Sequence, residues 1–282
     1  MEIKINNVNH IYHESTPFAN TALEGINLTF EEEHIIGIIG KSGSGKTTLV
    51  ELLNALLIPT EGNIDIENFN IKKGMKLDNI NDLRRKVGLV FQFPEEQFFN
   101  PTVREEVSFA LKYFRYRNDR IHKQVSEALT MVGLDDNYLE RNVFNLSGGE
   151  KRKVAIASVM VFNPKIVILD EPTIGLDYKS KKKLMQLIKK LKDRYHKTII
   201  IVSHDVDMLN VIADDIVVMD KGKVISSGPK NEVFKNTSLF RQYGLMLPKI
   251  VEFTGKVITE KGVILGRYTD VKDLIKDIYR HV

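Results

Sequence analysis

Short apolar runs of strand length alternate with amphipathic segments along most of the chain. The runs are rich in Ile, Val and Leu and are bounded by Gly, Asn or Asp, a pattern typical of β-strands. Because helical segments alternate with these strands, the sequence predicts an α/β fold with helices on the faces of a sheet. The predicted strands are Ile3–Asn9, Leu23–Phe30, Ile35–Ile39, Asn63–Ile66, Val87–Gln92, Ile166–Leu169, Thr198–Val202, Ile216–Met219 and Lys223–Ser226.

The strand pattern is interrupted once in the middle of the chain. From about Pro94 to Asn145 no segment favours strands, and the apolar spacing predicts helices over Val103–Phe114 and Arg120–Val132. We interpret this stretch as a helical insertion. The longest apolar run, Val154–Phe162, follows shortly afterwards and is half the length of a membrane span, so we expect a buried helix there.

The chain changes character again after about Pro229. Its tail is mixed, with a short strand pair predicted around Gly255–Tyr268 and a final amphipathic helix over Val271–Tyr279.

Composition narrows the class of protein. The 282 residues can bury a full core, and 43% hydrophobic and 28% charged residues are ordinary for a soluble protein. The first residues, Met1–Ile5, alternate like a strand and lack the regions of a signal peptide. Without cysteine, the chain has no disulfide framework, thiolate zinc site or cysteine nucleophile. We therefore expect a protein that stays in the cytosol.

Charge adds little to this picture. The formal net charge of +4 is too small to indicate nucleic acid. The densest basic stretch, Lys179–Lys192, carries leucines at helical spacing, which favours a solvated helix face. A patch for anionic lipid or nucleic acid is the alternative interpretation.

A glycine-rich run directly follows the apolar strand Ile35–Ile39 and predicts a nucleoside triphosphate site. Its glycines allow a tight turn whose backbone N–H groups point at phosphate oxygens, at the N-terminus of a helix that begins near Lys46. Lys46 would reach the β- and γ-phosphates, and Thr47 would offer its hydroxyl to Mg²⁺. The candidate phosphate-binding residues are Gly40, Lys41, Ser42, Gly43, Ser44, Gly45, Lys46, Thr47 and Thr48.

Two acids end another apolar run, Ile166–Leu169. This arrangement suits a buried parallel strand that presents carboxylates at its C-terminal edge. We expect Asp170 to hold Mg²⁺ through water and Glu171 to polarise the attacking water.

A second phosphate-binding element is predicted at Ser147, Gly148 and Gly149. A serine and two glycines at a helix N-terminus favour anions for the same reasons as the first loop. Because the first loop already cradles the triphosphate on one side, the simplest complete site uses two chains. Each chain would present this element to the γ-phosphate bound by the other.

At these residues the chain resembles the ATP-binding-cassette (ABC) ATPases, over nearly all of residues 1–235. The matching runs are GKSGSGKTT from Gly40, FQFPEEQ from Phe91, LSGGEKRKVAIA from Leu146, VILDEPTIGLD from Val167 and VSHD from Val202. The resemblance implies a P-loop fold with a RecA-like core, an antiparallel β subdomain and a helical insertion at about 94–150. A small C-terminal extension, 236–282, would serve dimerisation.

The resemblance also assigns roles to single residues. Tyr12 would stack on adenine, with plain packing as the alternative role. Gln92 would sense the γ-phosphate and contribute to the Mg²⁺ site, and His204 would contact the γ-phosphate. Asp177 would lie at the dimer interface. Glu150 stands where glutamine is commoner in the family, and its charge near phosphate would slightly weaken the contact with ATP.

Within the family, three segments are similar to the ATPases of energy-coupling factor (ECF) transporters, in particular to the second ATPase subunit. They are Phe91–Phe99, the opening from Tyr12 to Leu23, and Gly244–Lys249. The resemblance implies a peripheral protein on the cytoplasmic face of the cell membrane. Its partners would be a related ATPase, a transmembrane coupling protein and small integral-membrane components that capture vitamins or other micronutrients, and no nucleic acid.

The same resemblance predicts that coupling helices enter a groove beside Gln92–Phe99. Glu95 and Glu96 would pair with arginines there, or would simply be solvated.

Three alternatives define the rival classes. An ABC importer of another type, for amino acids or metal ions, would differ chiefly in what binds the helical insertion. A soluble ABC ATPase would usually show a long coiled-coil insertion or two cassettes, and the chain has neither. A P-loop kinase or GTPase would have no need of Leu146–Glu150.

Overall fold

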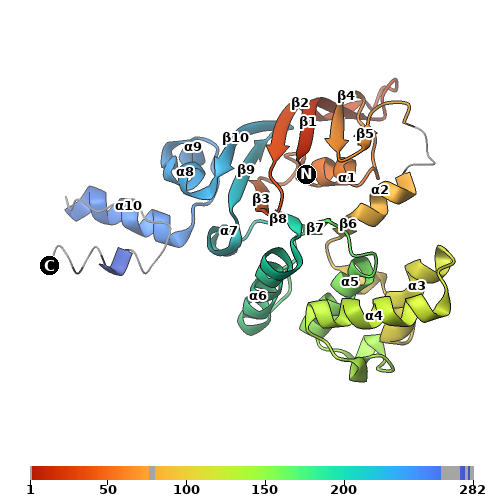
Figure 1. Ribbon diagram of the computed structural model, residues 1–282. Coiled ribbons are helices and arrows are strands. Elements are labelled where there is room, and N and C mark those ends of the chain that lie inside the picture. Colours follow the sequence, from red (N-terminus) through yellow and green to blue (C-terminus); the bar gives the residue numbers. More distant parts are fainter. Residues whose placement is uncertain (1, 76–79, 262–273, 277–278, 280–282) are drawn as a thin grey trace.

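Two β-sheets and the helices around them make up the fold (Figure 1). The computed structural model describes residues 2–75, 80–261, 274–276 and 279. One sheet has six strands in the order β10 (Lys223–Pro229), β9 (Asp215–Asp220), β3 (Ile35–Gly40), β8 (Thr198–Val202), β7 (Ile166–Asp170) and β6 (Val87–Val90). The other has four strands in the order β2 (Asn20–Phe30), β1 (Ile3–Tyr12), β4 (Glu61–Ile66) and β5 (Phe69–Ile71).

The six-stranded sheet is the core of the molecule. β3, β6, β7, β8 and β9 pair in parallel, and only β10 pairs antiparallel. Every residue of β3, β7 and β8 is buried, as expected of parallel strands that are covered on both faces. Alternate residues of β3 enter different clusters, with Ile36 and Ile38 on one face of the sheet and Ile35 and Ile39 on the other.

The four-stranded sheet covers one of these faces. All its pairings are antiparallel, and its buried residues, such as Ile3 and Ile64, pack in one cluster with Ile36 and Ile38. Leu49 of α1 (Lys46–Leu53) belongs to the same cluster. This arrangement confirms the predicted α/β fold with an antiparallel subdomain.

A group of helices forms the helical insertion, at the lower right of Figure 1. It contains α3 (Val103–Tyr113), α4 (Asn118–Val132) and α5 (Gly148–Met160), which pack on one another. Both helices predicted in this region are present, and the apolar run after Ser147 is confirmed as part of a buried helix. The Thr102 side chain caps α3 by accepting from the Glu105 N–H, and Gly133, with φ of 71°, ends α4.

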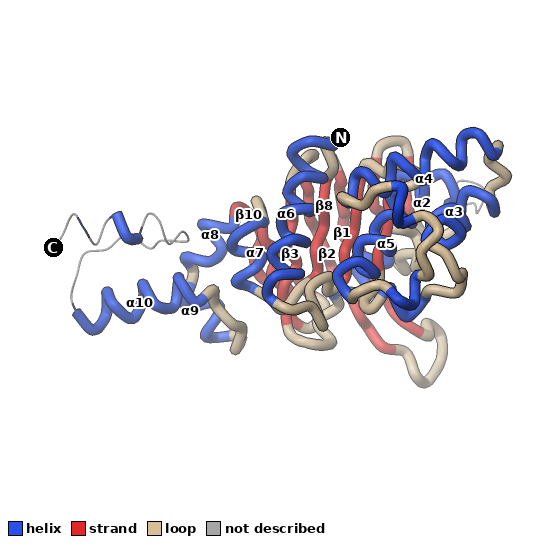
Figure 2. The backbone as a smooth tube through the Cα atoms, turned by 90° about the horizontal axis from the view of Figure 1, so that it is seen from below, coloured by secondary structure: helices blue, strands red, loops and turns tan. Residues whose placement is uncertain are grey.

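Of the remaining helices, one (Ile80–Lys86) lies on the side of the helical insertion, and the others lie along the six-stranded sheet or toward the C-terminus, as Figure 2 shows from below. Phe234, Phe240 and Val251, near the C-terminal end, are buried in the same cluster as the helices that flank the sheet. In the described part of the chain, no helix is both long and apolar enough to cross a bilayer. These helices are α2 (Ile80–Lys86), α6 (Tyr178–Tyr195), α7 (Val206–Ile212), α8 (Lys230–Lys235), α9 (Thr237–Gln242) and α10 (Lys249–Lys261).

The prediction for the tail is wrong where it can be compared. Residues 255–261, expected in a strand pair, belong to α10. The β-branched residues suggested strands, but Val251 and Thr254 share a buried helical face, and the Thr254 hydroxyl donates to the Ile250 carbonyl oxygen at 2.7 Å. The rest of that strand pair and most of the expected final helix lie outside the described residues.

Strand boundaries also differ from prediction. β1 continues to Tyr12 and β2 begins at Asn20, because the two strands pair up to the register Tyr12↔Asn20. β6 ends at Val90 rather than Gln92. Phe93 has a φ of 49°, and the following residues form the 3₁₀ turn Pro94–Gln97.

Candidate active site

The glycine-rich loop connects β3 to α1 at the carboxyl edge of the sheet. Gly45 precedes α1 with a φ of 96°, and a Cβ atom there would lie 2.7 Å from the Ala22 carbonyl oxygen, so the turn requires glycine. Nζ of Lys46 donates to the carbonyl oxygens of Gly40 at 2.9 Å and Lys41 at 2.7 Å. Burial lowers the pKa of Lys46, while Glu171 and Asp170 act in the opposite direction. The loop therefore holds a buried cation beside two acids.

The acidic pair stands at the end of β7, next to this loop. Asp170 is its last residue, and Oδ2 accepts a hydrogen bond from Oγ1 of Thr47 at 3.3 Å. Burial raises the pKa of Asp170, against the effects of Thr47 and Lys46. A hydroxyl beside a carboxylate fits Mg²⁺, which binds proteins through one or two such oxygens and takes further ligands from phosphate and water. Two of the three expected metal-site residues, Thr47 and Asp170, are thus adjacent, and the third, Gln92, lines the same cavity.

Glu171 is held from the next strand. Its Oε2 accepts hydrogen bonds from the Ser203 hydroxyl and the His204 N–H, both at 3.3 Å, just after β8. Its Oε1 is buried without a hydrogen bond from the described residues, and Nε2 of His204 lies 3.4 Å away. Glu171 also has a φ of 47°, a conformation that non-glycine residues rarely adopt and that gathers at functional sites.

These groups line one cavity of about 480 Å³, a size typical of ligand sites. The expected site residues that line it are Tyr12, Ser42, Gly43, Gly45, Lys46, Thr47, Thr48, Gln92, Asp170, Glu171 and His204. The carbonyl oxygens of Gly40 and Lys41 accept from Nζ of Lys46, and the Ser44 hydroxyl accepts from it at 3.4 Å. A backbone cradle, a buried lysine and a carboxylate suit a triphosphate with its metal.

Tyr12 reaches the cavity from the end of β1. Its hydroxyl is 3.0 Å from Oγ1 of Thr48, and its ring packs edge-on against His10 at 4.8 Å between centroids. Sequence reasoning missed Asn20, Thr21 and Ala22, which line the cavity beside it. Longer predicted strands for the first hairpin would have brought this stretch opposite Tyr12.

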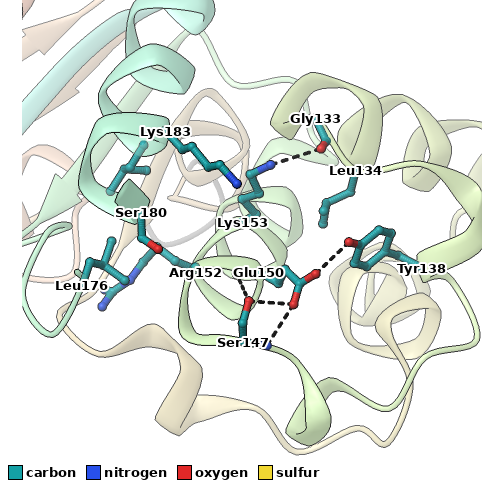
Figure 3. A pocket seen from close by; sticks show the side chains of 12 residues that line it. Gly133, Leu134, Tyr138, Ser147, Glu150, Arg152, Lys153, Leu176, Ser180 and Lys183 are labelled. Atoms are coloured by element: carbon teal, nitrogen blue, oxygen red, sulfur yellow. Dashed lines mark hydrogen bonds between the residues drawn. The ribbon is translucent and has the colours of Figure 1, made fainter. Parts of the chain in front are cut away.

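Ser147 and Gly149 line a different cavity of about 200 Å³, between the helical insertion and α6 (Figure 3). Ser147 is the N-cap of α5 and forms a capping box with Glu150. Oε2 of Glu150 accepts from the Ser147 N–H at 2.9 Å and hydroxyl at 2.6 Å, and Oε1 accepts from the Tyr138 hydroxyl at 2.7 Å. These bonds lower the pKa of Glu150 to about 2, with the Ser147 side chain the largest contributor.

Glu150 therefore has a role that sequence reasoning missed. Its carboxylate fixes the hydroxyl and N–H of Ser147 at the start of α5.

Asp177 caps α6 and lies between Leu176 and Ser180, which both line this second cavity. Its side chain accepts from the Ser180 N–H at 3.0 Å and from the Ser180 hydroxyl at 2.7 Å, which lowers the pKa of Asp177. Its expected place at a dimer interface stays a prediction.

The two glutamates expected to meet coupling helices differ from each other. Glu96 is exposed, but Glu95 is only 22% exposed, and its Oε1 accepts from Nη2 of the buried Arg152 at 3.2 Å. Glu95 thus pairs with an arginine of its own chain, so the expectation that it pairs with a coupling helix or is solvated is wrong for this residue. Sequence reasoning missed Arg152, because nothing local connects it to a residue 57 positions away.

Known proteins share these features. The sequence profile of the ABC transporter family matches residues 23–174. The energy-coupling factor transporter ATP-binding protein EcfA2 of Caldanaerobacter subterraneus is 41% identical over 93% of this chain and 91% of its own length. EcfA2 of Clostridium perfringens is 42% identical over 89% of this chain and 87% of its own.

Solved structures agree on the fold. The structure of cbiO1 from Clostridium perfringens, described as part of the ABC transporter complex cbiONQ, has a TM-score of 0.76 and 35% identity, covering 90% of this chain and 98% of that one. These similarities span both the motifs and the chain beyond them. The chain belongs to the ABC transporter ATPases and, among them, to the ATP-binding subunits of energy-coupling factor transporters.

Proposed function

We propose that this chain binds and hydrolyses ATP as one of two ATPase subunits that power an energy-coupling factor importer for vitamins or other micronutrients. The observation that carries the proposal is the convergence of Lys46, Asp170, Glu171 and His204 on one cavity. Phosphoryl transfer to water needs neutralised phosphate charge and a positioned nucleophile, and this cavity holds groups for both.

Each residue has a proposed part in that reaction. Lys46 neutralises charge on the β- and γ-phosphates, and Glu171 accepts a hydrogen bond from the attacking water through its unbonded Oε1. His204 contacts the γ-phosphate and orients Glu171. Thr47, Asp170 and Gln92 would hold Mg²⁺, which supplies Lewis-acid stabilisation of phosphate charge when bound. Tyr12 stacks on adenine.

A second ATPase subunit completes the proposed site. Ser147 and Gly149 line a cavity separate from the one that holds the phosphate loop, which supports their action on a partner's ATP. A similar solved structure, described as a dimer of the ATP-binding cassette MJ0796 bound to ADP and Pi, has a TM-score of 0.70, 33% identity and coverage of 80% of this chain and 98% of that one. We propose a related ATPase as the partner.

The remaining proposed partners lie in the membrane. The chain would sit on the cytoplasmic face, with the segment around Gln92–Phe99 receiving coupling helices of a transmembrane protein. Glu96 is available there to pair with a basic side chain. Exposed aromatic side chains nearby support a docking surface, since Phe99 is 59% and Phe109 46% exposed and their rings meet edge-on at 4.6 Å.

Magnesium-dependent ATP hydrolysis tests the catalytic part of the proposal. Glu171→Gln keeps the size of the side chain but removes the base, and we expect kcat to fall by roughly 10²–10⁴-fold while ATP still binds. Glu232→Gln, an exposed glutamate in α8, is the matched control and should hydrolyse ATP normally. A Glu171→Gln variant that hydrolyses ATP at the wild-type rate would contradict the assigned role of Glu171.

A further inference from the structure

Arg152 is a buried cation that uses only two of its five N–H donors among the described residues. It lies in α5, and 1% of its surface is exposed. Its Nη2 donates to Oε1 of Glu95 at 3.2 Å and to the Ile174 carbonyl oxygen at 3.1 Å. Its Nε and Nη1 are buried and have no hydrogen-bond partner among the described residues, and neither has Oε2 of Glu95.

Such a group is a poor way to stabilise a fold. A guanidinium loses hydration on burial, and the loss is recovered only when its geometry and hydrogen bonds are complete. Burial does lower the pKa of Arg152, with Glu95 acting against it, yet arginine keeps its charge at neutral pH. An apolar side chain of similar volume would pack here at lower cost. The contacts of Arg152 must therefore be explained by what they connect.

They connect three parts of the proposed catalytic machinery. Glu95 lies three residues after Gln92, beyond the strained Phe93. Ile174 lies midway between Glu171 and Asp177 and lines the nucleotide cavity. Arg152 itself stands in the second turn of the helix that Ser147 caps, and it lines the cavity beside Ser147 (Figure 3). The guanidinium therefore contacts two of these parts, through Glu95 and Ile174, and its own helix is the third.

We propose that Arg152 is a positioning residue that couples the Gln92 segment and the loop from Glu171 to Asp177 to the helix that begins at Ser147. In the described arrangement it uses one nitrogen for both partners. The unused Nε, Nη1 and Oε2 atoms allow a second arrangement, in which Arg152 and Glu95 pair through two parallel hydrogen bonds. A change at Gln92 is thereby transmitted to Ser147 and Asp177. The inference rests on the proposed function, because it takes these residues as parts of one ATPase.

Kinetics of the chain purified with its partners provide the first test. Arg152→Met removes the bonds but keeps an unbranched stem, and Lys151→Met is the matched control on the same helix. We expect Arg152→Met to lower kcat at least tenfold and to leave the dissociation constant for ATP within twofold, with partial recovery in Arg152→Lys. Because both side chains serve one contact, adding Glu95→Gln to Arg152→Met should cause no further loss. Unchanged kcat, or losses that multiply in the double variant, would overturn the proposal.

Distance measurements separate positioning from simple support of the fold. Because the chain has no cysteine, spin labels can be placed at two exposed positions, Gln97→Cys in the Gln92 segment and Lys179→Cys in α6, just after the loop that ends at Asp177. We expect one narrow distance distribution that shifts with Mg²⁺ and ATP. Arg152→Met should broaden it and abolish the shift, while Lys151→Met should not.

Identical distributions in Arg152→Met and the wild type would refute the coupling. If Arg152→Met fails to fold, Glu95→Gln carries the same predictions. A wild-type complex that never hydrolyses ATP would refute the proposed function instead, while distances measured without nucleotide would still report whether Arg152 holds the two segments together.

Discussion

Nε2 of His204 lies 3.4 Å from Oε1 of Glu171, the carboxylate oxygen that accepts no hydrogen bond from the described residues. The other oxygen is fixed by the Ser203 hydroxyl and the His204 N–H. One carboxylate oxygen is thus anchored, and the other faces the side chain of His204, which follows the neighbouring strand. A general base must hold one water in a fixed position, and a carboxylate with one oxygen anchored can present its other oxygen to that water in a defined orientation.

The pH dependence of hydrolysis should follow from this pair. Burial raises the pKa of Glu171, and the charge on His204 lowers it. Glu171 acts as a base only when ionised, so kcat should fall as pH falls through its pKa. His204→Ala removes an influence that lowers this pKa, and the acidic limb of the pH–rate profile should move to higher pH. His196→Ala, at an exposed histidine paired with Glu33, should leave the limb in place. A limb that stays fixed or moves to lower pH in His204→Ala would contradict the assignment.

Glu150 should contribute stability that depends on pH in a defined window. Its pKa is lowered from 4.5 to about 2 in the folded chain, chiefly by the Ser147 side chain. The unfolded chain therefore binds this proton first as pH falls, and the stabilisation is complete above pH 4.5 and lost toward pH 2. Glu150→Gln cannot titrate. The difference in free energy of unfolding between wild type and Glu150→Gln, measured with denaturant, should shrink across this window. A difference that does not vary with pH there would argue against the capping role.

Tyr12 should contribute to adenine binding rather than to phosphate binding. Stacking of an aromatic ring on a base is worth about 1–3 kcal/mol, so Tyr12→Ala should weaken ATP binding roughly 5- to 150-fold. Inorganic tripolyphosphate, which lacks a base, should bind both forms equally in calorimetry. Tyr12→Phe loses only the contact with Thr48 and should bind ATP nearly as the wild type does. If Tyr12→Ala binds ATP normally, the ring serves packing alone.

Glu95 and Glu96 should respond differently to charge reversal. Glu95→Lys would place a second cation against buried Arg152, and we expect a loss of stability of about 3 kcal/mol or more. Glu96→Lys changes an exposed residue, so its melting temperature should stay the same while recovery of membrane partners falls. Thermal unfolding and affinity purification measure the two effects. Full assembly of Glu96→Lys would rule out the proposed pairing with a basic side chain.

Sequence reasoning located the nucleotide cavity because its residues follow strands in fixed patterns. Lys46 comes after β3, Asp170 ends β7 and His204 comes after β8, and the carboxyl ends of adjacent parallel strands meet at one edge. Each of these residues could thus be placed from its own local motif.

Contacts between distant segments could not be found in this way. The Arg152–Glu95 pair and the bond from Tyr138 to Glu150 depend on how the helical insertion packs, which no local spacing encodes. The prediction for the tail failed because it relied on local propensity. Thr254, Val257 and Ile258 favour strands individually, but burial of one face of α10 overrides that propensity.

As one of two ATPase subunits of an energy-coupling factor importer, this chain should assemble with the membrane proteins of that importer. Affinity purification of the tagged chain from detergent-solubilised membranes of its source cell, followed by mass spectrometry, tests it most directly. We predict recovery of a second related ATPase, one transmembrane coupling protein and several small membrane proteins. Two copies of this chain with a single permease and an extracellular binding protein would identify an importer of another type, and recovery without any membrane protein would contradict a role in transport.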